Sequence, residues 1–334
     1  MKERIGYIDG AKAIGIWLVI MGHCSNTTTA YPHLVSIIYL FHMPLFFIIS
    51  GFLFSEKKSQ DFCVFSKMGG GKYVKSYVRP FIVASIATFL VLLTFCFLKH
   101  IVIWPEVKRL ITAISWGAGW SGDSQVFGWM PAIGPIWFLL ALFWACVIYS
   151  LVNKWFKGID KAVVIVGLFS FGMFSSRFII LPWSIQSGCC AVIYLYIGNL
   201  IRKYDLLNKK LSWESILILI GLVLFCSFKG GIAMNACVYE QGFISVIASV
   251  ASCLAVFFII KKTGFVGGWT GRNTLCLMCG NQIVDYLNYF YRAGSVFKDI
   301  THISIVNFLC EFVVCLLLTY LFGFIFYKSR LIAH

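Results

Sequence analysis

Three ionisable side chains lie in the first long apolar segment of the chain: Asp9, Lys12 and His23, within residues 7–25. Ionisable groups are costly inside a bilayer, so each of them is a candidate for function. His23 follows Lys12 by eleven positions, which at about 100° per residue brings both to within roughly 20° of one direction. All three share one helix face, with His23 about 16 Å further across the membrane than Lys12. This polar stripe predicts a path across the membrane and makes the three residues catalytic candidates.

The second apolar segment, residues 34–54, supplies another histidine. His42 precedes Pro44, which removes a backbone donor and kinks a helix, and Gly51 permits close approach of a neighbour. A kinked helix that carries His42 beside His23 would form a pocket. An imidazole suits general-base chemistry there because its unperturbed pKa lies near neutrality. No HxxxH or HExxH pattern is present, so we expect no metal site.

Two acids of later apolar segments, Asp285 and Glu311, are candidates to orient or charge-balance a catalytic histidine. Their order along the chain leaves open which of them does so. Ser50, in the second segment, is a further candidate. Four of these residues also have a structural interpretation: snorkelling for Lys12, the start of a helix for Asp9, and core or backbone hydrogen bonds for His23 and His42.

The segment from residue 56 to residue 79 is strongly basic, with six cations against two acids. Such a loop forms an anion-attracting mouth. Lys72, Lys75 and Arg79 are its last three cations, and we expect them to bind the phosphates of a coenzyme. The alternative is that these charges only set the orientation of the chain in the membrane.

The composition requires a membrane around these residues. Of the 334 residues, 60% are hydrophobic and 12% are charged, and the mean hydropathy of +0.87 exceeds what a water-facing surface can carry. Apolar runs long enough to cross a bilayer predict an all-α integral membrane protein, a bundle of about ten transmembrane helices. The predicted spans lie near residues 7–25, 34–54, 80–98, 135–153, 162–180, 184–201, 213–228, 243–260, 270–290 and 303–327.

The basic residues predict the orientation. Of the 28 Lys and Arg residues, 20 fall in loops on the side of the N-terminus and 7 at the opposite side, which places both termini in the cytoplasm. Because the net charge of +15 is distributed in this way, the lipid bilayer and not nucleic acid is the expected partner. We expect one transmembrane domain over residues 1–334, with no appended soluble domain.

Three further features of the sequence are weaker indications of structure. Most of the thirteen cysteines lie in apolar runs, where a thiol acts as a small hydrophobe. The outer segment 99–134, which is rich in Trp and Gly, predicts an interfacial or re-entrant element. The polar predicted spans 184–201 and 270–290 are candidates for broken or cavity-lining helices.

Four stretches of the chain carry a recognisable pattern: Tyr7-Ile8-Asp9 with Lys12 and Gly22-His23; Leu40-Phe41-His42-Met43-Pro44-Leu45-Phe46-Phe47 with Ser50-Gly51-Phe52-Leu53; Trp137-Phe138-Leu139 with Ala141-Leu142; and Gly198-Asn199-Leu200-Ile201-Arg202. This pattern resembles the acyltransferase-3 family of bacterial membrane O-acyltransferases, over nearly the whole chain. The first fifty residues are the most specific part of the resemblance. It adds Trp137, in the family's tryptophan motif, to the candidate site residues.

The chain departs from the family in two places. The family usually has two arginines three positions apart before the third span, where this chain has Lys72 and Lys75, followed by Arg79. Lysine keeps the charge but loses bidentate phosphate geometry. The family often has a histidine in the penultimate span, where this chain has Asn281. In this respect the chain is more similar to the fucose 4-O-acetylase-like sugar O-acetyltransferases than to the generic form of the family.

The resemblance implies a membrane O-acetyltransferase of the bacterial inner (plasma) membrane. It would transfer an acetyl group from cytoplasmic acetyl-CoA to a hydroxyl of a cell-envelope or surface polysaccharide sugar, with a glycan or lipid-linked sugar as acceptor. His23 would act as base or as transient acetyl carrier. The alternatives are a multi-pass transporter or flippase for an anionic or glycolipid substrate, with the histidines as a proton relay, and a catalytically inactive scaffold.

Overall fold

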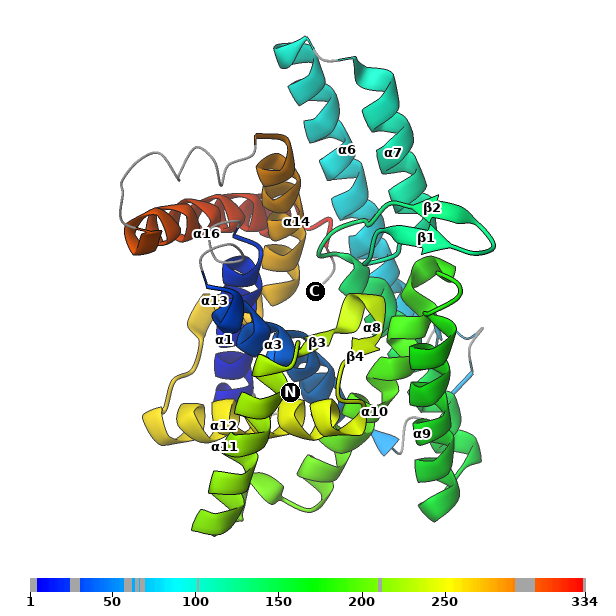
Figure 1. The fold of residues 1–334 in the computed structure, drawn as a ribbon. Helices are drawn as coiled ribbons and strands as arrows, with labels where there is room; N and C mark the ends of the chain where they lie inside the picture. The colour runs from blue at the N-terminus through cyan, green and yellow to red at the C-terminus, as the bar shows by residue number, and fades with distance from the viewer. Residues whose placement is uncertain are drawn as a thin grey trace.

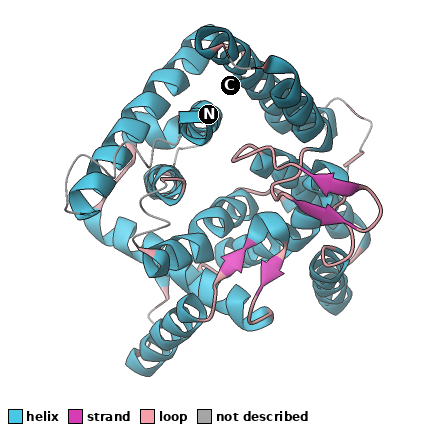
Figure 2. Ribbon diagram, turned by 45° about the horizontal axis from the view of Figure 1, so that its top comes forward, coloured by secondary structure: helices cyan, strands magenta, loops and turns pink. Residues whose placement is uncertain are grey.

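The computed structural model describes residues 5–24, 31–56, 62–63, 66, 70–100, 102–209, 212–291 and 304–332. Three cations of the predicted basic loop, Lys57, Lys58 and Lys67, lie outside these ranges. Helices form nearly all of the described structure, and its strands form two short hairpins (Figure 2).

Among the described residues of the first half of the chain there are six long helices, which Figure 1 labels. They are α1 (Gly6–Gly22), α3 (Pro32–Phe52), α6 (Arg79–Lys99), α7 (Ile103–Trp116), α8 (Trp137–Trp155) and α9 (Gly158–Ser175). A short helix α5 (Gly70–Tyr73) and a π-helical turn (Val74–Val78) lead into α6, and the hairpin of β1 (Gly122–Ser124) and β2 (Gly128–Met130) follows α7. In this antiparallel hairpin Gly122 is opposite Met130.

The second half contains five more long helices. They are α10 (Ile185–Lys203), α11 (Trp213–Phe228), α12 (Phe243–Thr263), α14 (Thr274–Tyr291) and α16 (Ser304–Ser329). The short helix α13 (Gly268–Arg272) precedes α14, and the hairpin of β3 (Ile232–Ala233) and β4 (Val238–Tyr239) lies between α11 and α12.

Each of the ten predicted spans coincides with one long helix, which confirms an all-α membrane protein. Seven helical segments of the described chain are long and apolar enough to cross a bilayer: those that contain α3, α6, α8, α9, α10, α12 and α16. The other three predicted spans are α1, α11 and α14, with 17, 16 and 18 residues. The first two are short for a span. Helix α14 is continuous, but polar side chains lower its hydropathy.

The predicted close approach at Gly51 is present. A Cβ atom on Gly51 would overlap the carbonyl oxygen of Leu195 in α10, and one on Gly198 would overlap the carbonyl oxygen of Ile48 in α3. Each helix therefore places a glycine against the backbone of the other, as in small-residue helix crossings in membranes. Pro44 lies inside α3 without ending the helix. This crossing joins α3 to α10, which also packs against α8 and α9.

The two polar predicted spans, 184–201 and 270–290, differ in whether their helix is continuous. In residues 270–290, α13 ends at Arg272 and α14 begins at Thr274, so the break lies at the start of the predicted span, and the polar residues that indicated it lie within the unbroken α14. Residues 185–203 form one unbroken helix, preceded by Trp183 and Ser184 in left-handed backbone conformations. The outer segment 99–134 forms α7, which lies beside α6 (Figure 1), and the first hairpin.

Candidate active site

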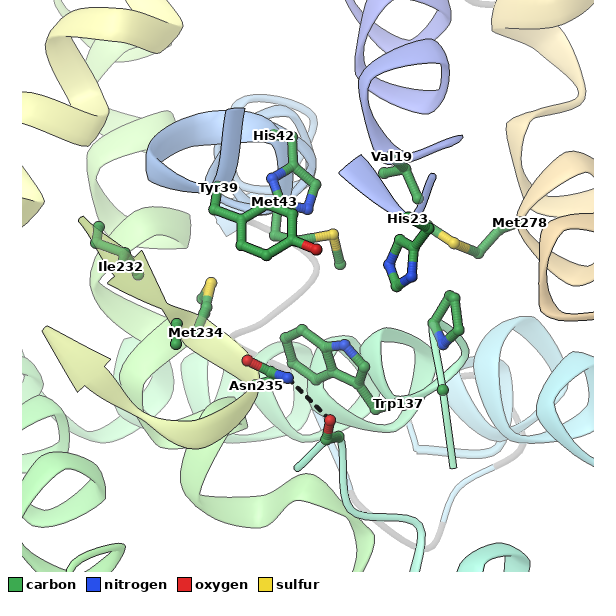
Figure 3. Close-up of a pocket in the computed structure, with 14 residues that line it drawn as sticks. Val19, His23, Tyr39, His42, Met43, Trp137, Ile232, Met234, Asn235 and Met278 are labelled. Atoms are coloured by element: carbon green, nitrogen blue, oxygen red, sulfur yellow. Dashed lines mark hydrogen bonds between the residues drawn. The ribbon is translucent and has the colours of Figure 1, made fainter. Parts of the chain in front are cut away.

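A pocket of about 90 Å³ lies where the end of α1, the middle of α3 and the start of α8 meet two loops (Figure 3). Its polar lining comes from four side chains, those of His23, Tyr39, His42 and Asn235, together with the indole of Trp137. Apolar side chains and the glycines at 119 and 134 complete the wall. The predicted pocket between the two histidines is therefore present, and its remaining walls come from residues far away in the sequence.

His23 ends α1 and is paired with an acid of α14. Its Nδ1 atom lies 2.8 Å from Oδ1 of Asp285, and the two side chains are 29% and 26% exposed. A carboxylate only accepts hydrogen bonds, so Nδ1 carries the proton and donates it. The lone pair of the neutral imidazole is then on Nε2, which is the arrangement of an oriented general base. Of the two acids left open by the sequence, the structure pairs Asp285 with His23.

The imidazole of His42 is held in the same tautomer as that of His23, but by a different acceptor. Its Nδ1 lies 2.8 Å from the carbonyl oxygen of Ile38, one turn earlier in α3. A carbonyl accepts, so this imidazole also keeps its lone pair on Nε2. The ring of Tyr39 packs against it at a centroid distance of 5.0 Å, and the Tyr39 hydroxyl donates to the carbonyl of Gly22 at 2.9 Å. Tyr39 thus ties the His42 helix to the end of the His23 helix.

Gln282, one turn before Asp285 in α14, holds the loop that leads into α8. Its Nε2 donates to the carbonyl of Ile133 at 2.7 Å, and its Oε1 accepts from the backbone amide of Ile136 at 3.2 Å. Between these two residues, Gly134 has φ +90°, and a Cβ there would lie 2.9 Å from Oε1 of Gln282. One face of α14 therefore positions both Asp285 and a pocket wall.

The opposite wall is formed by the turn between β3 and β4. Nδ2 of Asn235 donates to the carbonyl of Gly119 at 2.9 Å (Figure 3), and the hydroxyl of Ser187 in α10 donates to the carbonyl of Asn235 at 3.3 Å. A Cβ on Gly119 would lie 2.5 Å from the Trp137 ring. The absent side chain at 119 lets the two loops close on the indole.

Asp9 and Lys12 lie towards the other end of α1. Nζ of Lys12 is 3.3 Å from Oδ1 of Asp9, and the Asp9 carbonyl packs against the glycines at 267 and 271 beside α13. Eleven residues of helix separate Lys12 from His23, about 16 Å along the axis. Neither residue lines the pocket, and their catalytic role stays a prediction.

The three predicted coenzyme-binding cations lie on one helical run. Lys72, Lys75 and Arg79 follow one another by three and four positions across α5, the π-helical turn and the start of α6, a spacing that places them on neighbouring parts of one face. All three are exposed, and their side chains form no hydrogen bond or ion pair with the described residues. A π-helical turn is rare and often marks a functional site.

The other predicted site residues have structural contacts. Ser50 donates to the carbonyl of Phe46 at 2.8 Å, within its own helix. Asn281 is buried and accepts from Thr319 of α16 at 3.4 Å, and Glu311 of α16 is fully buried. The structure places none of these three in the wall of the pocket. Among the described residues, no group of three or more His, Cys, Asp or Glu side chains could hold a metal ion.

Sequence reasoning did not single out Tyr39, Asn235 or Gln282. The signal for Gln282 was available, because an amide in an apolar helix one turn from an acid is unusual. Asn235 lies in a short loop between two apolar runs, and nothing in its local sequence distinguishes it.

The family model described as an acyltransferase domain matches residues 5–331. The chain therefore belongs to the acyltransferase-3 family, and it is a multi-pass membrane acyltransferase. Comparison with curated proteins and with solved structures gave no match.

Proposed function

We propose that this acyltransferase is an O-acetyltransferase of the bacterial inner membrane, which moves an acetyl group from acetyl-CoA to a hydroxyl of a cell-envelope sugar. The observation that carries this proposal is the His23–Asp285 pair at 2.8 Å, which presents a free imidazole nitrogen at a pocket. The orientation expected from the basic residues places this end of α1 at the outer face. An acceptor glycan or lipid-linked sugar would reach the pocket from that side.

In direct transfer, Nε2 of His23 removes the proton of the acceptor hydroxyl. The hydroxyl oxygen then attacks the thioester carbonyl carbon, the carbon–sulfur bond breaks, and the proton passes to the leaving thiolate, so that coenzyme A departs as a thiol. Asp285 stabilises the imidazolium while it holds the proton. His42, whose Nε2 is also free to accept, is placed to orient the acceptor hydroxyl.

The donor would enter beside the start of α6, a helix that does not line the pocket. Lys72, Lys75 and Arg79 would hold its phosphates at the cytoplasmic start of α6. There, Cys279 of α14 is 3.9 Å from the carbonyl of Pro80. Asp285 is six residues further along α14, which corresponds to about 9 Å. A coenzyme held at this cytoplasmic end would extend its acetyl group along α14 towards Asp285 and His23.

Purified protein in nanodiscs, incubated with acetyl-labelled acetyl-CoA and an envelope glycan extract, tests the proposal. Label on the glycan is the expected result, and its loss on brief alkali treatment would identify an ester. Label retained on the protein would favour a relay through an acetyl-histidine over direct transfer. An absence of any glycan label, with coenzyme and protein unchanged, would contradict the proposed function.

A further inference from the structure

A second hollow, of about 860 Å³, lies on another side of α3. We call it the apolar groove; its walls are one face of α11, the second half of α12, and Ile37 and Phe41 of α3. Phe41 precedes His42, so α3 separates the groove from the histidine pocket. No residue lines both hollows. The groove is therefore a separate feature that the proposed chemistry does not use.

The walls of the groove suit hydrocarbon and not a sugar. Along α11 the lining consists of Trp213 followed by Ile216, Leu219, Ile220, Val223 and Leu224. Ser252 of α12 lines the groove too, but its hydroxyl donates to the carbonyl of Ala248 at 3.0 Å. Since this hydroxyl proton is already used within its helix, little in the central groove can bind a polar ligand. A sugar there would lose its hydrogen bonds to water without replacement.

Polar groups gather at one end of the groove, where the segment after α10 meets the end of α12. Lys261 of α12 donates to the carbonyl of Leu207 at 3.2 Å and to Oδ1 of Asn208, which fixes this segment. Asn208 also donates to Asp205 at 2.8 and 2.9 Å. Lys209, which follows, lines the groove and is exposed, and its ammonium group has no polar partner among the described residues. It is a cation available to an anionic group.

The length of the groove matches one leaflet of a bilayer. Its lining on α11 runs from Trp213 to Leu224, eleven residues or about 16 Å, whereas half of a hydrocarbon core is about 15 Å. Trp213 lies beside the charged end, at the level where tryptophan rings meet lipid head groups. The charged end carries Lys209 and is cytoplasmic in the orientation expected from the basic residues.

We propose that the apolar groove binds one anionic phospholipid of the cytoplasmic leaflet, with an acyl chain between α11 and α12 and the phosphate at Lys209. This lipid differs from the proposed acceptor, because its head group lies at the opposite membrane face from the histidine pocket. Its chain would pack on Phe41 and so support the helix that carries His42. The lipid site is independent of whether acetyl transfer takes place.

The test uses the full chain in detergent, exposed to vesicles of equal parts phosphatidylglycerol and phosphatidylcholine, then repurified for native mass spectrometry. We expect phosphatidylglycerol to remain bound to the wild type. Ile220→Trp fills the groove and should reduce bound phosphatidylglycerol about tenfold through steric exclusion. Ile218→Trp is the matched control, since Ile218 is on the same helix, is 63% exposed, and does not line the groove; it should retain the lipid.

Lys209→Gln tests the head-group contact at an exposed position that is not needed for folding. It should reduce the preference for phosphatidylglycerol over phosphatidylcholine about fivefold, the value of one cation near a membrane surface. Should Ile220→Trp fail to fold, Leu224→Trp at the other end of the groove replaces it. Equal lipid retention by the groove and control variants would overturn the proposal, as would equal binding of both lipids by the wild type.

Discussion

Two histidines of neighbouring helices face one pocket, and each has its protonated nitrogen fixed by an acceptor. The acceptor is the Asp285 carboxylate for His23 and the Ile38 carbonyl for His42. These partners differ in charge, so only His23 gains an electrostatic reason to hold a second proton during catalysis. This difference supports the proposal that His23 is the general base and that His42 has a positioning role.

We expect His23→Ala to lower the rate of transfer by a factor of about 10² to 10⁴, the usual contribution of a general base. Asp285→Asn should give a smaller loss, because the base remains but its orientation and charge stabilisation weaken. His33→Ala is the control: His33 is an exposed histidine of α3 that packs on Phe228 and should leave the rate unchanged. Initial rates on protein quantified in nanodiscs are the measurement. A near-normal rate in His23→Ala would remove this residue from the active site.

Gln282 allows a second prediction at this scale. Gln282→Leu leaves the carbonyl of Ile133 and the amide of Ile136 without partners, each at a cost of about 1–3 kcal/mol, so the loop before Trp137 should shift and kcat should fall. Gln282→Glu keeps the acceptor for Ile136 and should recover part of the loss. The Michaelis constant for acetyl-CoA should stay constant in both variants, because the coenzyme is expected to bind elsewhere. A rise of that constant with unchanged kcat would contradict a positioning role.

The sequence identified His23, His42 and Asp285 because ionisable groups in apolar segments are rare and costly. It could not choose between Asp285 and Glu311, since the choice depends on how α14 and α16 pack around α1. Tyr39 and Asn235 reach the pocket through contacts with Gly22 and Gly119. No local pattern encodes such long-range contacts.

At the level of elements, the α3–α10 crossing holds one side of the pocket. Gly51 and Gly198 bring the two backbones together, and in a bilayer such close packing replaces the hydrophobic effect as the main attraction between helices. The sequence indicated one side of this contact through Gly51. Its partner Leu195 could not be foreseen, because helix pairing is a property of the folded bundle.

Gly51→Ala should therefore destabilise the protein by about 1–3 kcal/mol, since the added methyl group overlaps the Leu195 carbonyl and forces the helices apart. Gly221→Ala is a matched control in α11, where a Cβ would meet nothing within 4 Å. It should be neutral or slightly stabilising, by up to about 1 kcal/mol, because alanine favours helix. The midpoint of thermal unfolding in one detergent gives the comparison. Equal midpoints for the two variants would show that the crossing tolerates a side chain.

Helices were predicted correctly where the apolar runs are long. The short irregular segments between helices were not predicted. All ten predicted spans are helices, because a bilayer requires internal hydrogen bonding over each apolar run. The break at Asn273 was not located by the sequence, because the polar residues that indicated a break, Asn281, Gln282 and Asp285, lie within the unbroken α14. The π-helical turn at Val74–Val78 was not predicted either, since its extra residue per turn leaves no periodic signal.

For the molecule as a whole, the histidine pocket and the exposed cations lie at different levels along α8: Trp137 at its start lines the pocket, whereas Tyr73, next to Lys72, hydrogen-bonds to Ser150 near its end. The pocket is bounded by loops expected at the outer face, and the cations precede α6 at the face expected to be cytoplasmic. A donor from the cytoplasm and an acceptor outside could thus meet without either crossing the membrane completely. In the proposed function, this arrangement would separate donor binding from the chemical step.

That separation allows the last prediction, for a variant in which Lys72, Lys75 and Arg79 are all replaced by glutamine. Phosphate contacts remote from the reacting carbonyl bind ground and transition states about equally, so the Michaelis constant for acetyl-CoA should rise while kcat changes little. With exposed ion pairs worth about 0.2–1 kcal/mol each, three lost contacts predict a rise between about threefold and a hundredfold. The Michaelis constant for the acceptor should not move.

The competing explanation is that these charges only orient the chain, in which case the triple variant would insert wrongly or fail to accumulate. Kinetics are therefore measured on protein that has been quantified and shown by protease accessibility to have normal topology. Lys229→Gln serves as the control, because it removes an exposed cation at the end of α11 expected to face outside and should leave both Michaelis constants unchanged. An unaltered constant for acetyl-CoA in correctly inserted triple variant would defeat the coenzyme-binding assignment, and the source of donor affinity would then have to lie elsewhere in the bundle.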